Sequence, residues 1–346
     1  MHQQFTLISL ILVYLIMSQM NKKTLKETLK TADKKVIFGL LTVILTAIVT
    51  VVSPMIKLGS NNNNNAPKNQ GQNTNITYSS AKEITSNENI TKGTYTSEKA
   101  DENAILVTGD VTSTLENITV SKTGDSDGGD TTSFYGTNSA ILAKGGANVT
   151  IKNATIETDA NGANGVFSYG GSATTNNSSS DGTTITISDS KITTKKNNSG
   201  GIMTTGGGTT IAKNLTITTE GTSSAAIRSD RGGGTVEVDG GSYTTNGQGS
   251  PTVYSTADIT VKNATLNATS SEGIVIEGKN KVTLENVELT DTNNTLNGQS
   301  TTYKNIFLYQ SMSGDAASGE AVFTSKNSTI TTNKGDSFYV TNTTAT

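Results

Sequence analysis

Seven aromatic and charged side chains could form one surface, since six recur at equivalent places along this chain and the seventh, Arg231, adjoins them. They are Tyr169, Arg228, Asp230, Arg231, Tyr254, Glu277 and Tyr309. Tyrosine rings stack on flat ligands, while carboxylates and guanidinium groups hydrogen-bond hydroxyl or carboxylate groups. Only 5% of the residues are aromatic, so a gathering of tyrosines on one face is informative. The set predicts a binding face for a ring-shaped ligand that carries hydroxyl groups.

The only two arginines, Arg228 and Arg231, flank Asp230 just before three consecutive glycines. An arginine fork can bind a carboxylate through two parallel hydrogen bonds, so one interpretation is an ion pair that fixes the bend before the glycines. The other interpretation is recognition of carboxylates on an acidic polysaccharide. Both remain open at the level of the sequence.

An acidic, glycine-rich stretch offers candidate metal ligands at Asp125, Asp127 and Asp130. Alternating carboxylates supply the oxygen ligands that Ca²⁺ prefers, so we expect a calcium site here. The stretch lacks the glutamate at the twelfth position of an EF-hand loop, and an ordinary exposed acidic loop is the competing interpretation.

Composition excludes several other chemistries. The chain has no cysteine, which rules out a thiol nucleophile, a disulfide scaffold and a thiolate zinc site. Its one histidine, His2, precedes an apolar segment and cannot serve a Ser-His pair in the body of the chain. A net charge of −3 and the scarcity of arginine argue against nucleic acid as a partner.

A short template that recurs along the chain predicts the elements that position these side chains. It alternates apolar residues around a central Asn, as in Leu115-Glu-Asn117-Ile-Thr-Val120. Further copies span residues 151–156, 261–266 and 284–289, and looser copies span 187–192, 211–217 and 238–243. Asn, Asp and Gly tolerate a left-handed backbone, so the template indicates strand, sharp bend, strand.

A second set of apolar residues begins each repeat. Its members are Ile141, Val166, Ile202, Ile227, Val253, Ile274, Ile306 and Phe338, and the shortest intervals are roughly 21–26 residues. The repeat, the hydrophobic content of only 32% and the scarcity of proline predict an all-β fold, a right-handed parallel β-helix with a narrow core.

Because strand side chains alternate, the residues one and three places after these starting residues point outward from Val166 onward and predict an exposed stripe. Its members are Phe167, Tyr169, Met203, Thr205, Arg228, Asp230, Tyr254, Thr256, Val275, Glu277, Phe307, Tyr309, Tyr339 and Thr341. A binding face is one interpretation. The other is that insertions fold over the stripe and bury its aromatic residues in a satellite core.

The N-terminal quarter predicts a membrane anchor. Val36 to Ile56 is apolar and uncharged over about 20 residues, the length of one transmembrane helix. Lysines cluster before it, so we expect the N-terminal segment up to residue 35 in the cytoplasm and the C-terminal domain outside the cell. We also expect translation to begin at Met17 or Met20, which would leave residues 1–16 untranslated. Residues 57–75 are an Asn-rich flexible linker and 76–346 form the β-helix. A cleaved signal peptide, giving a secreted protein, is the alternative. The repeat stops in mid-turn at Thr346, which predicts truncation at the C-terminus.

Several strings resemble bacterial carbohydrate-binding parallel β-helix proteins of anaerobic Gram-positive organisms, some of which are labelled adhesins. They are Ser133-Phe-Tyr-Gly-Thr-Asn138, the stretches from Ser223 and from Ser250, Glu272-Gly-Ile-Val-Ile-Glu277 and Tyr309-Gln-Ser-Met-Ser-Gly-Asp315. The resemblance implies a surface protein that binds plant cell-wall polysaccharide, with calcium in the fold and a shape related to pectate-type lyases.

We therefore expect a monomeric, membrane-anchored ectodomain that binds cellulose or an acidic pectic polymer for adhesion or substrate capture, without catalysis. A Ca²⁺-dependent pectate-type lyase is the alternative, because such chemistry needs only a cation and a base such as Arg228 or Lys144. An ice-binding solenoid is a third possibility, but charged and aromatic residues interrupt the threonine column that it requires.

Overall fold

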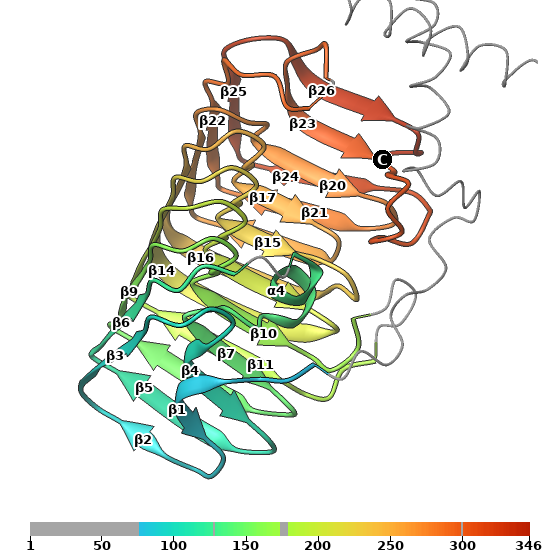
Figure 1. The fold of residues 1–346 in the computed structure, drawn as a ribbon. Coiled ribbons are helices and arrows are strands. Elements are labelled where there is room, and N and C mark those ends of the chain that lie inside the picture. The colour runs from blue at the N-terminus through green and yellow to red at the C-terminus, as the bar shows by residue number, and fades with distance from the viewer. Residues whose placement is uncertain (1–75, 127–128, 174–178, 299) are drawn as a thin grey trace, which may run out of the picture. The chain divides into compact units, whose positions relative to one another are not determined.

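The computed structural model describes residues 76–126, 129–173, 179–298 and 300–346, and these form a parallel β-helix (Figure 1). Each strand pairs in parallel with the equivalent strands of the neighbouring turns, and the strands of the first and last described turns pair on one side. The predicted all-β parallel fold is confirmed.

The strands form two sheets, a 10-stranded sheet A and a 16-stranded sheet B. Sheet A contains β1 (Ser80–Ile84), β4 (Asn103–Thr108), β7 (Ile141–Lys144), β10 (Val166–Tyr169), β13 (Ile202–Thr205), β15 (Ile227–Ser229), β17 (Val253–Ser255), β20 (Ile274–Glu277), β23 (Lys304–Tyr309) and β26 (Asp336–Thr341).

Sheet B bends along its length into two arms. The first arm contains β2 (Asn89–Ile90), β5 (Thr112–Glu116), β8 (Asn148–Lys152), β11 (Thr184–Ser188), β18 (Asp258–Lys262), β21 (Lys281–Glu285) and β24 (Val322–Lys326). The second arm contains β3 (Gly93–Ser97), β6 (Ile118–Lys122), β9 (Thr155–Thr158), β12 (Lys191–Thr194), β19 (Thr265–Ala268), β22 (Glu288–Asp291) and β25 (Thr329–Thr332). The long strands β14 (Gly208–Thr219) and β16 (Gly234–Thr245) run through the bend.

The bend in sheet B lies at the residue that the repeated template predicts. The bend residues have positive φ: Asn117, Asn153, Asp189, Asn214, Gly240, Asn263, Asn286 and Asn327. Their side chains also form a partial ladder, since the Asn286 amide donates to the Asn263 Oδ1 at 3.1 Å and the Asn263 amide donates to Asp239 at 2.7 Å. The strand, bend, strand interpretation is confirmed.

One looser copy of the template differs in register from its expected form. Ile211 is 37% exposed, whereas Ala212 is buried and pairs with Ile187. The bend at Asn214 fixes which residues face inward, because strand side chains alternate and the residue two positions before the bend points into the core. Ile211 therefore points outward and the smaller Ala212 points into the core.

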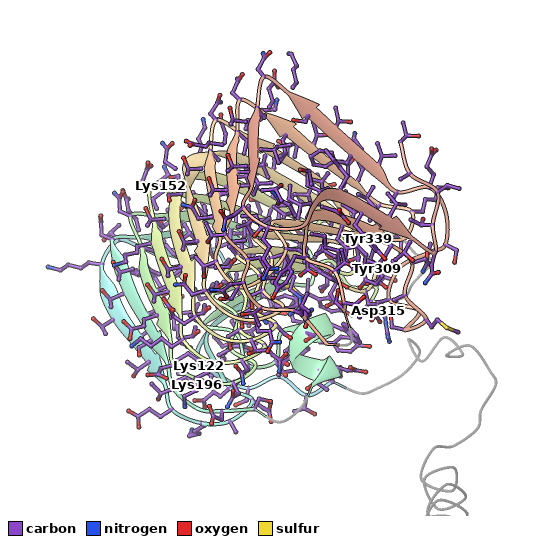
Figure 2. All side chains as sticks on the ribbon, turned by 90° about the horizontal axis from the view of Figure 1, so that it is seen from above. Lys122, Lys152, Lys196, Tyr309, Asp315 and Tyr339 are labelled. Carbon is purple, nitrogen blue, oxygen red and sulfur yellow. The ribbon has the colours of Figure 1, made fainter. Side chains whose placement is uncertain are left out.

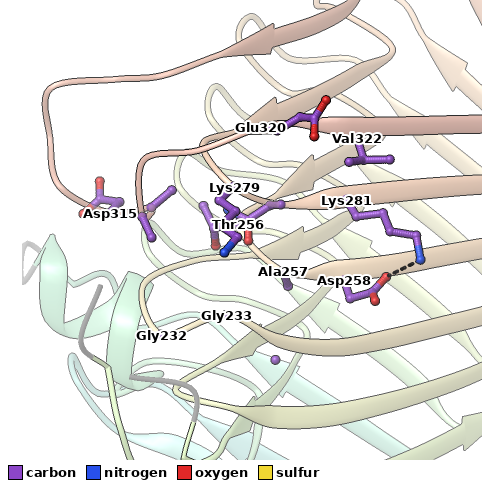
Figure 3. A pocket seen from close by; sticks show the side chains of 14 residues that line it. Gly232, Gly233, Thr256, Ala257, Asp258, Lys279, Lys281, Asp315, Glu320 and Val322 are labelled. Atoms are coloured by element: carbon purple, nitrogen blue, oxygen red, sulfur yellow. Dashed lines mark ion pairs between the residues drawn. The ribbon is translucent and has the colours of Figure 1, made fainter. Parts of the chain in front are cut away.

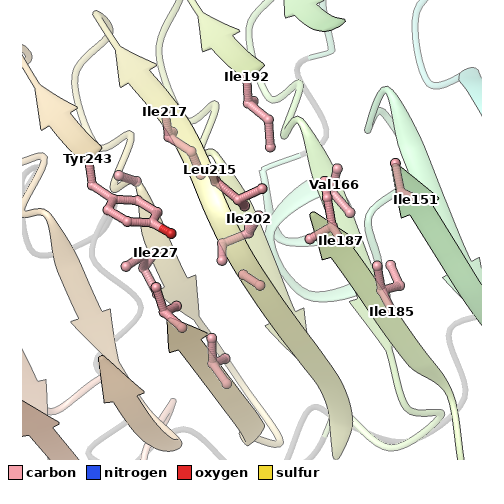
Figure 4. Packing of buried hydrophobic residues seen from close by; sticks show 14 of the residues in the cluster. Ile151, Val166, Ile185, Ile187, Ile192, Ile202, Leu215, Ile217, Ile227 and Tyr243 are labelled. Atoms are coloured by element: carbon pink, nitrogen blue, oxygen red, sulfur yellow. The ribbon is translucent and has the colours of Figure 1, made fainter. Parts of the chain in front are cut away.

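The eight predicted starting residues lie in register along sheet A. Ile202 pairs with Ile227, and Ile227 pairs with Val253. All eight starting residues except Phe338 contact the apolar residues of both arms of sheet B in one continuous core (Figure 4). In the last turn Phe338 and Val340 are 55% and 47% exposed.

Serines replace apolar residues at one corner of the coil. The Ser199, Ser224 and Ser250 hydroxyls each accept a backbone N–H from the preceding turn, at 3.0, 2.9 and 2.8 Å. All three serines are fully buried. Hydrogen-bonded polar side chains can be buried at little cost, so part of the interior needs no apolar residue.

The described chain also contains a short helix, α4 (Asp130–Tyr135), that the sequence did not predict. It belongs to an insertion between β6 and β7 and lies over sheet A (Figure 1). No helix among the described residues is long and apolar enough to span a membrane. The predicted cytoplasmic segment 1–35, anchor 36–56 and linker 57–75 lie outside the described residues.

Candidate functional site

The outer face of sheet A is covered over its N-terminal half. Leu106, Leu142, Phe167 and Met203 point outward on consecutive strands, yet each is at most 3% exposed, and they form a separate apolar cluster. The predicted exposure of the stripe is wrong for Phe167, Met203 and Thr205, which an insertion covers, as the satellite-core interpretation expected. It is also wrong for Thr256 and Val275 further along sheet A, which are 4% and 6% exposed.

Contacts with helix α4 hold this cover in place. The Thr205 hydroxyl donates to the Phe134 carbonyl oxygen at 2.7 Å, and the Tyr78 hydroxyl donates to the Tyr135 carbonyl oxygen at 3.2 Å. The ring of Tyr169 packs edge-on against Tyr135, with centroids 5.5 Å apart. Burial raises the pKa of Tyr169 to about 12. Tyr169 therefore belongs to the cover of the apolar cluster.

The C-terminal half of the same face carries a column of mixed chemistry. Arg228, Tyr254, Val275, Phe307 and Tyr339 occupy equivalent positions on β15, β17, β20, β23 and β26. Glu277 and Tyr309 end β20 and β23, two residues after Val275 and Phe307, and they pair with each other. Figure 2 shows Tyr309, Tyr339 and Asp315 on the same side of the coil, away from Lys152 of sheet B. We call this region the aromatic column.

Glu277 is the centre of a hydroxyl network under the aromatic column. Its Oε2 accepts hydrogen bonds from the hydroxyls of Tyr254 and Tyr309, the latter at 3.0 Å. Its Oε1 accepts hydrogen bonds from the hydroxyls of Ser311 and Ser313. The Glu277 residue is only 1% exposed, so these hydroxyls replace water around the carboxylate. Burial and the nearby Glu277 charge raise the pKa of both tyrosines well above its usual value.

The two arginines bind different carboxylates. Arg228 pairs with Asp230 at 2.7 Å, and the Asp230 Oδ1 also accepts the Arg231 backbone N–H at 2.9 Å. Arg231 pairs with Asp315 at 2.5 Å, and its guanidinium lies 4.1 Å from the centroid of the Phe134 ring. Burial raises the pKa of Asp230 to about 6, although Arg228 opposes that shift. The ion-pair interpretation of this segment is confirmed for Arg228 and Asp230.

Three polar residues of this network were missed from the sequence as site residues. Ser311, Ser313 and Asp315 belong to the loop of residues 310–321 between β23 and β24, which folds back to Arg231. The loop has no repeat of its own, so no spacing in the sequence assigns it a partner. It covers Glu277, and the predicted exposure of Glu277 and Asp230 is wrong, since they are 1% and 4% exposed.

Six of the seven predicted residues thus lie in one connected region, and Tyr169 lies under α4. Asp230 and Glu277 are buried and bind neighbouring side chains through an ion pair and hydrogen bonds. Phe307, Tyr309 and Tyr339 are partly exposed. The rings of Phe307 and Tyr309 are stacked at 4.6 Å, and Tyr339 lies 5.9 Å from Phe307. Arg228 and Tyr254 are partly exposed as well, so the accessible part of the region extends from β15 to β26.

A cavity of about 620 Å³ lies beside the 310–321 loop, which contributes part of its lining (Figure 3). It is lined by the corner glycines 232–234, by Lys279, Lys281 and Asp258, and by Asp315. Lys281 and Asp258 form an ion pair at 3.7 Å across its wall. The lining contains no aromatic ring, which distinguishes it from the aromatic column.

The predicted calcium ligands fall in different environments. Asp125 accepts the Asn161 backbone N–H at 2.8 Å and lies 3.5 Å from Lys196, while Asp130 is exposed in the first turn of α4. Asp127 lies outside the described residues. Within the described ranges, no group of three or more His, Cys, Asp or Glu is arranged to hold a metal ion. The calcium site stays a prediction.

Comparisons of the chain with protein-family models, with curated protein sequences and with solved structures found no match. The resemblance to carbohydrate-binding β-helix proteins therefore stays a prediction. The class that the structure itself defines is a parallel β-helix with a polar and aromatic outer face on one sheet.

Proposed function

We propose that the chain binds a neutral polysaccharide along the aromatic column on the outer face of sheet A. The observation that carries the proposal is the partly exposed group of Phe307, Tyr309 and Tyr339 on neighbouring strands β23 and β26. Aromatic rings with open faces contribute to ligand binding through stacking and through burial of apolar area. In a chain with 5% aromatic residues, three partly exposed rings together favour sugar binding over a general polar surface.

Charge favours a neutral ligand over the acidic pectic polymer. Both arginines of the region already bind carboxylates, Arg228 to Asp230 and Arg231 to Asp315. Glu277 adds a further negative charge whose hydrogen-bond donors are hydroxyls. A uronate chain would meet more carboxylates than cations here and would have to break an ion pair to reach a guanidinium. Cellulose-like glucans do not have that penalty.

Binding is also favoured over lyase chemistry. A lyase base must reach a proton of the bound sugar, yet Arg228 lies in its ion pair with Asp230. Lys144, the other candidate base, lies 4.7 Å from the centroid of the Tyr78 ring in the part of sheet A covered by α4. The proposed protein is a right-handed β-helix at the cell surface that binds calcium. We propose that residues 36–56 anchor it in the membrane and that it serves adhesion or substrate capture.

The proposal is tested by binding isotherms of the full-length chain with soluble glucan and with polygalacturonate, with and without Ca²⁺. We expect glucan to bind, and Phe307→Ala to weaken this binding at least several-fold. Phe323→Ala is the matched control, because Phe323 packs against the main core. Tighter binding of polygalacturonate would contradict the neutral ligand, and ultraviolet absorbance from an unsaturated product would replace binding by catalysis.

A further inference from the structure

A second cavity, of about 340 Å³, lies at the end of the aromatic column. Its lining includes Glu272, Asn297, Lys304, Phe307 and Tyr339. One wall comes from residues 297 and 300–302 of the connection between β22 and β23. Its volume is at the lower end of the range for small-ligand sites. None of the seven residues singled out in the sequence lies in this lining.

A buried ion pair forms the inner wall of this cavity. Lys304 and Glu272 are 3.3 Å apart, with side chains 4% and 6% exposed. The Lys304 ammonium donates to the Ser300 hydroxyl at 2.6 Å and to the Thr302 carbonyl oxygen at 3.4 Å. Because the two charges cancel and the ammonium holds the loop, the wall is neutral overall and fixed in position.

The aromatic floor is arranged around the same ammonium. Lys304 lies 4.4 Å from the Phe307 centroid and 5.4 Å from the Tyr339 centroid. Phe307 is covered on one side by the stacked ring of Tyr309, at 4.6 Å and 11°. Tyr339 is partly exposed on β26, and its ring is tilted 55° from Phe307. Tyr339 therefore offers the more accessible ring face.

Glu272 has hydrogen-bonding capacity left over for a ligand. A carboxylate has about four acceptor positions. The described partners of Glu272 are Lys304 on Oε1 and the Ser271 hydroxyl on Oε2, at 3.0 Å. Hydroxyl donors are the groups that such a carboxylate would accept from, and the Asn297 side chain nearby can both donate and accept.

We propose that this cavity is a subsite for one neutral pyranose ring, which stacks on Tyr339 and donates hydroxyl hydrogen bonds to Glu272. The inference rests on the proposed function and names a subsite of the same face. A linear oligosaccharide that reaches from Tyr254 to Tyr339 crosses three strand spacings, about 14 Å. Long oligosaccharides should therefore gain affinity from the subsite, and disaccharides should not bridge it to the rest of the column.

The experiment compares disaccharides and linear hexasaccharides of glucose, mannose and xylose by calorimetry on the full-length chain. We expect at least one hexasaccharide to bind more tightly than its disaccharide, and Tyr339→Ala to weaken hexasaccharide binding about tenfold. Tyr339→Phe should keep the affinity, because the ring face remains. Tyr339→Leu retains an apolar contact with Phe307 and should lose affinity like Tyr339→Ala. Glu272→Gln should weaken binding several-fold.

The outcomes separate this subsite from the proposed function. If no hexasaccharide binds the unaltered chain, both fail. If a hexasaccharide binds and loses affinity in Phe307→Ala but not in Tyr339→Ala or Tyr339→Leu, the binding face stands and this subsite is overturned. If the unaltered chain binds hexagalacturonate more tightly than the neutral hexasaccharides, and Tyr339→Ala removes this preference, the proposal of a neutral ligand is overturned. Met312→Ala is the control, since Met312 is 90% exposed and outside the cavity lining.

Discussion

Arg231 and Asp315 lie 84 residues apart in the sequence and form an ion pair of 2.5 Å that ties the 310–321 loop to the turn after β15. Both side chains are mostly buried, at 14% and 21% exposure. Loss of one partner leaves the other charge poorly solvated, so Asp315→Ala should lower the free energy of unfolding by about 1–2 kcal/mol. It should also speed hydrogen exchange at residues 310–321.

Hydrogen-exchange mass spectrometry checks this, with Asp258→Ala as the control. Asp258 also pairs with a basic residue, Lys281 at 3.7 Å, but is 57% exposed in its side chain. Unchanged exchange in the 310–321 loop of the Asp315 variant would show that the ion pair does not hold the loop.

The hydroxyl network around Glu277 makes a stronger prediction. Glu277→Ala removes the acceptor of the Tyr254, Tyr309 and Ser311 hydroxyls. Tyr254 and Tyr309 still lie 3.3 Å apart and Ser311 still lies 2.6 Å from Ser313, so these pairs satisfy part of the lost hydrogen bonding. A buried donor without its partner costs about 1–3 kcal/mol, and we expect a total loss of roughly 3 kcal/mol in urea denaturation. Glu277→Gln should lose less, because its amide oxygen still accepts.

Glu288→Ala is the matched control for this measurement, because Glu288 is exposed on β22. It should change the free energy of unfolding by less than about 0.5 kcal/mol. Equal effects of the two alanine variants would mean that the Glu277 network is not needed for stability.

The repeat could be predicted from the sequence because each turn obeys a local rule. An Asn or Gly bend at positive φ, flanked by alternating apolar residues, fixes the register of neighbours such as Ile151 and Ile187. The cover of sheet A could not be predicted in this way. The contacts of α4 with Thr205 and of Ser311 with Glu277 join residues 71 and 34 positions apart, and neither insertion repeats.

Part of the interior is acid-sensitive in a direction that can be measured. Asp291 is fully buried; its Oδ1 accepts the Asn293 N–H at 2.6 Å, and its Oδ2 has no partner among the described atoms. Burial raises the pKa of Asp291 from 3.8 to about 6. The folded chain therefore binds this proton more tightly than the unfolded chain does. Its contribution to stability is complete below pH 3.8 and is lost as the pH rises through 6.

Asp291→Asn removes this titration. We expect the free energy of unfolding of the variant, minus that of the unaltered chain, to increase between pH 4 and pH 6.5 in urea titrations. Asp110→Asn, at an exposed position, is the control for the amide substitution itself. A flat difference for Asp291→Asn would show that its carboxyl group titrates alike in the folded and unfolded chain.

The bend residues predict losses of different size for two small substitutions at one position. Asn263 has φ of 52° and its side-chain amide donates to Asp239 at 2.7 Å. Asn263→Ala loses this hydrogen bond and the one that its Oδ1 accepts from Asn286, and it places a residue with poor tolerance for the left-handed region there, at a cost of about 1–2 kcal/mol. Asn263→Gly loses the same two hydrogen bonds but relieves the backbone, as Gly240 does at the equivalent bend of the preceding turn. Urea denaturation should therefore rank the free energy of unfolding as Asn263, then Gly, then Ala. If the alanine variant equalled or exceeded the glycine variant, the side-chain ladder rather than the backbone would determine why Asn recurs at this corner.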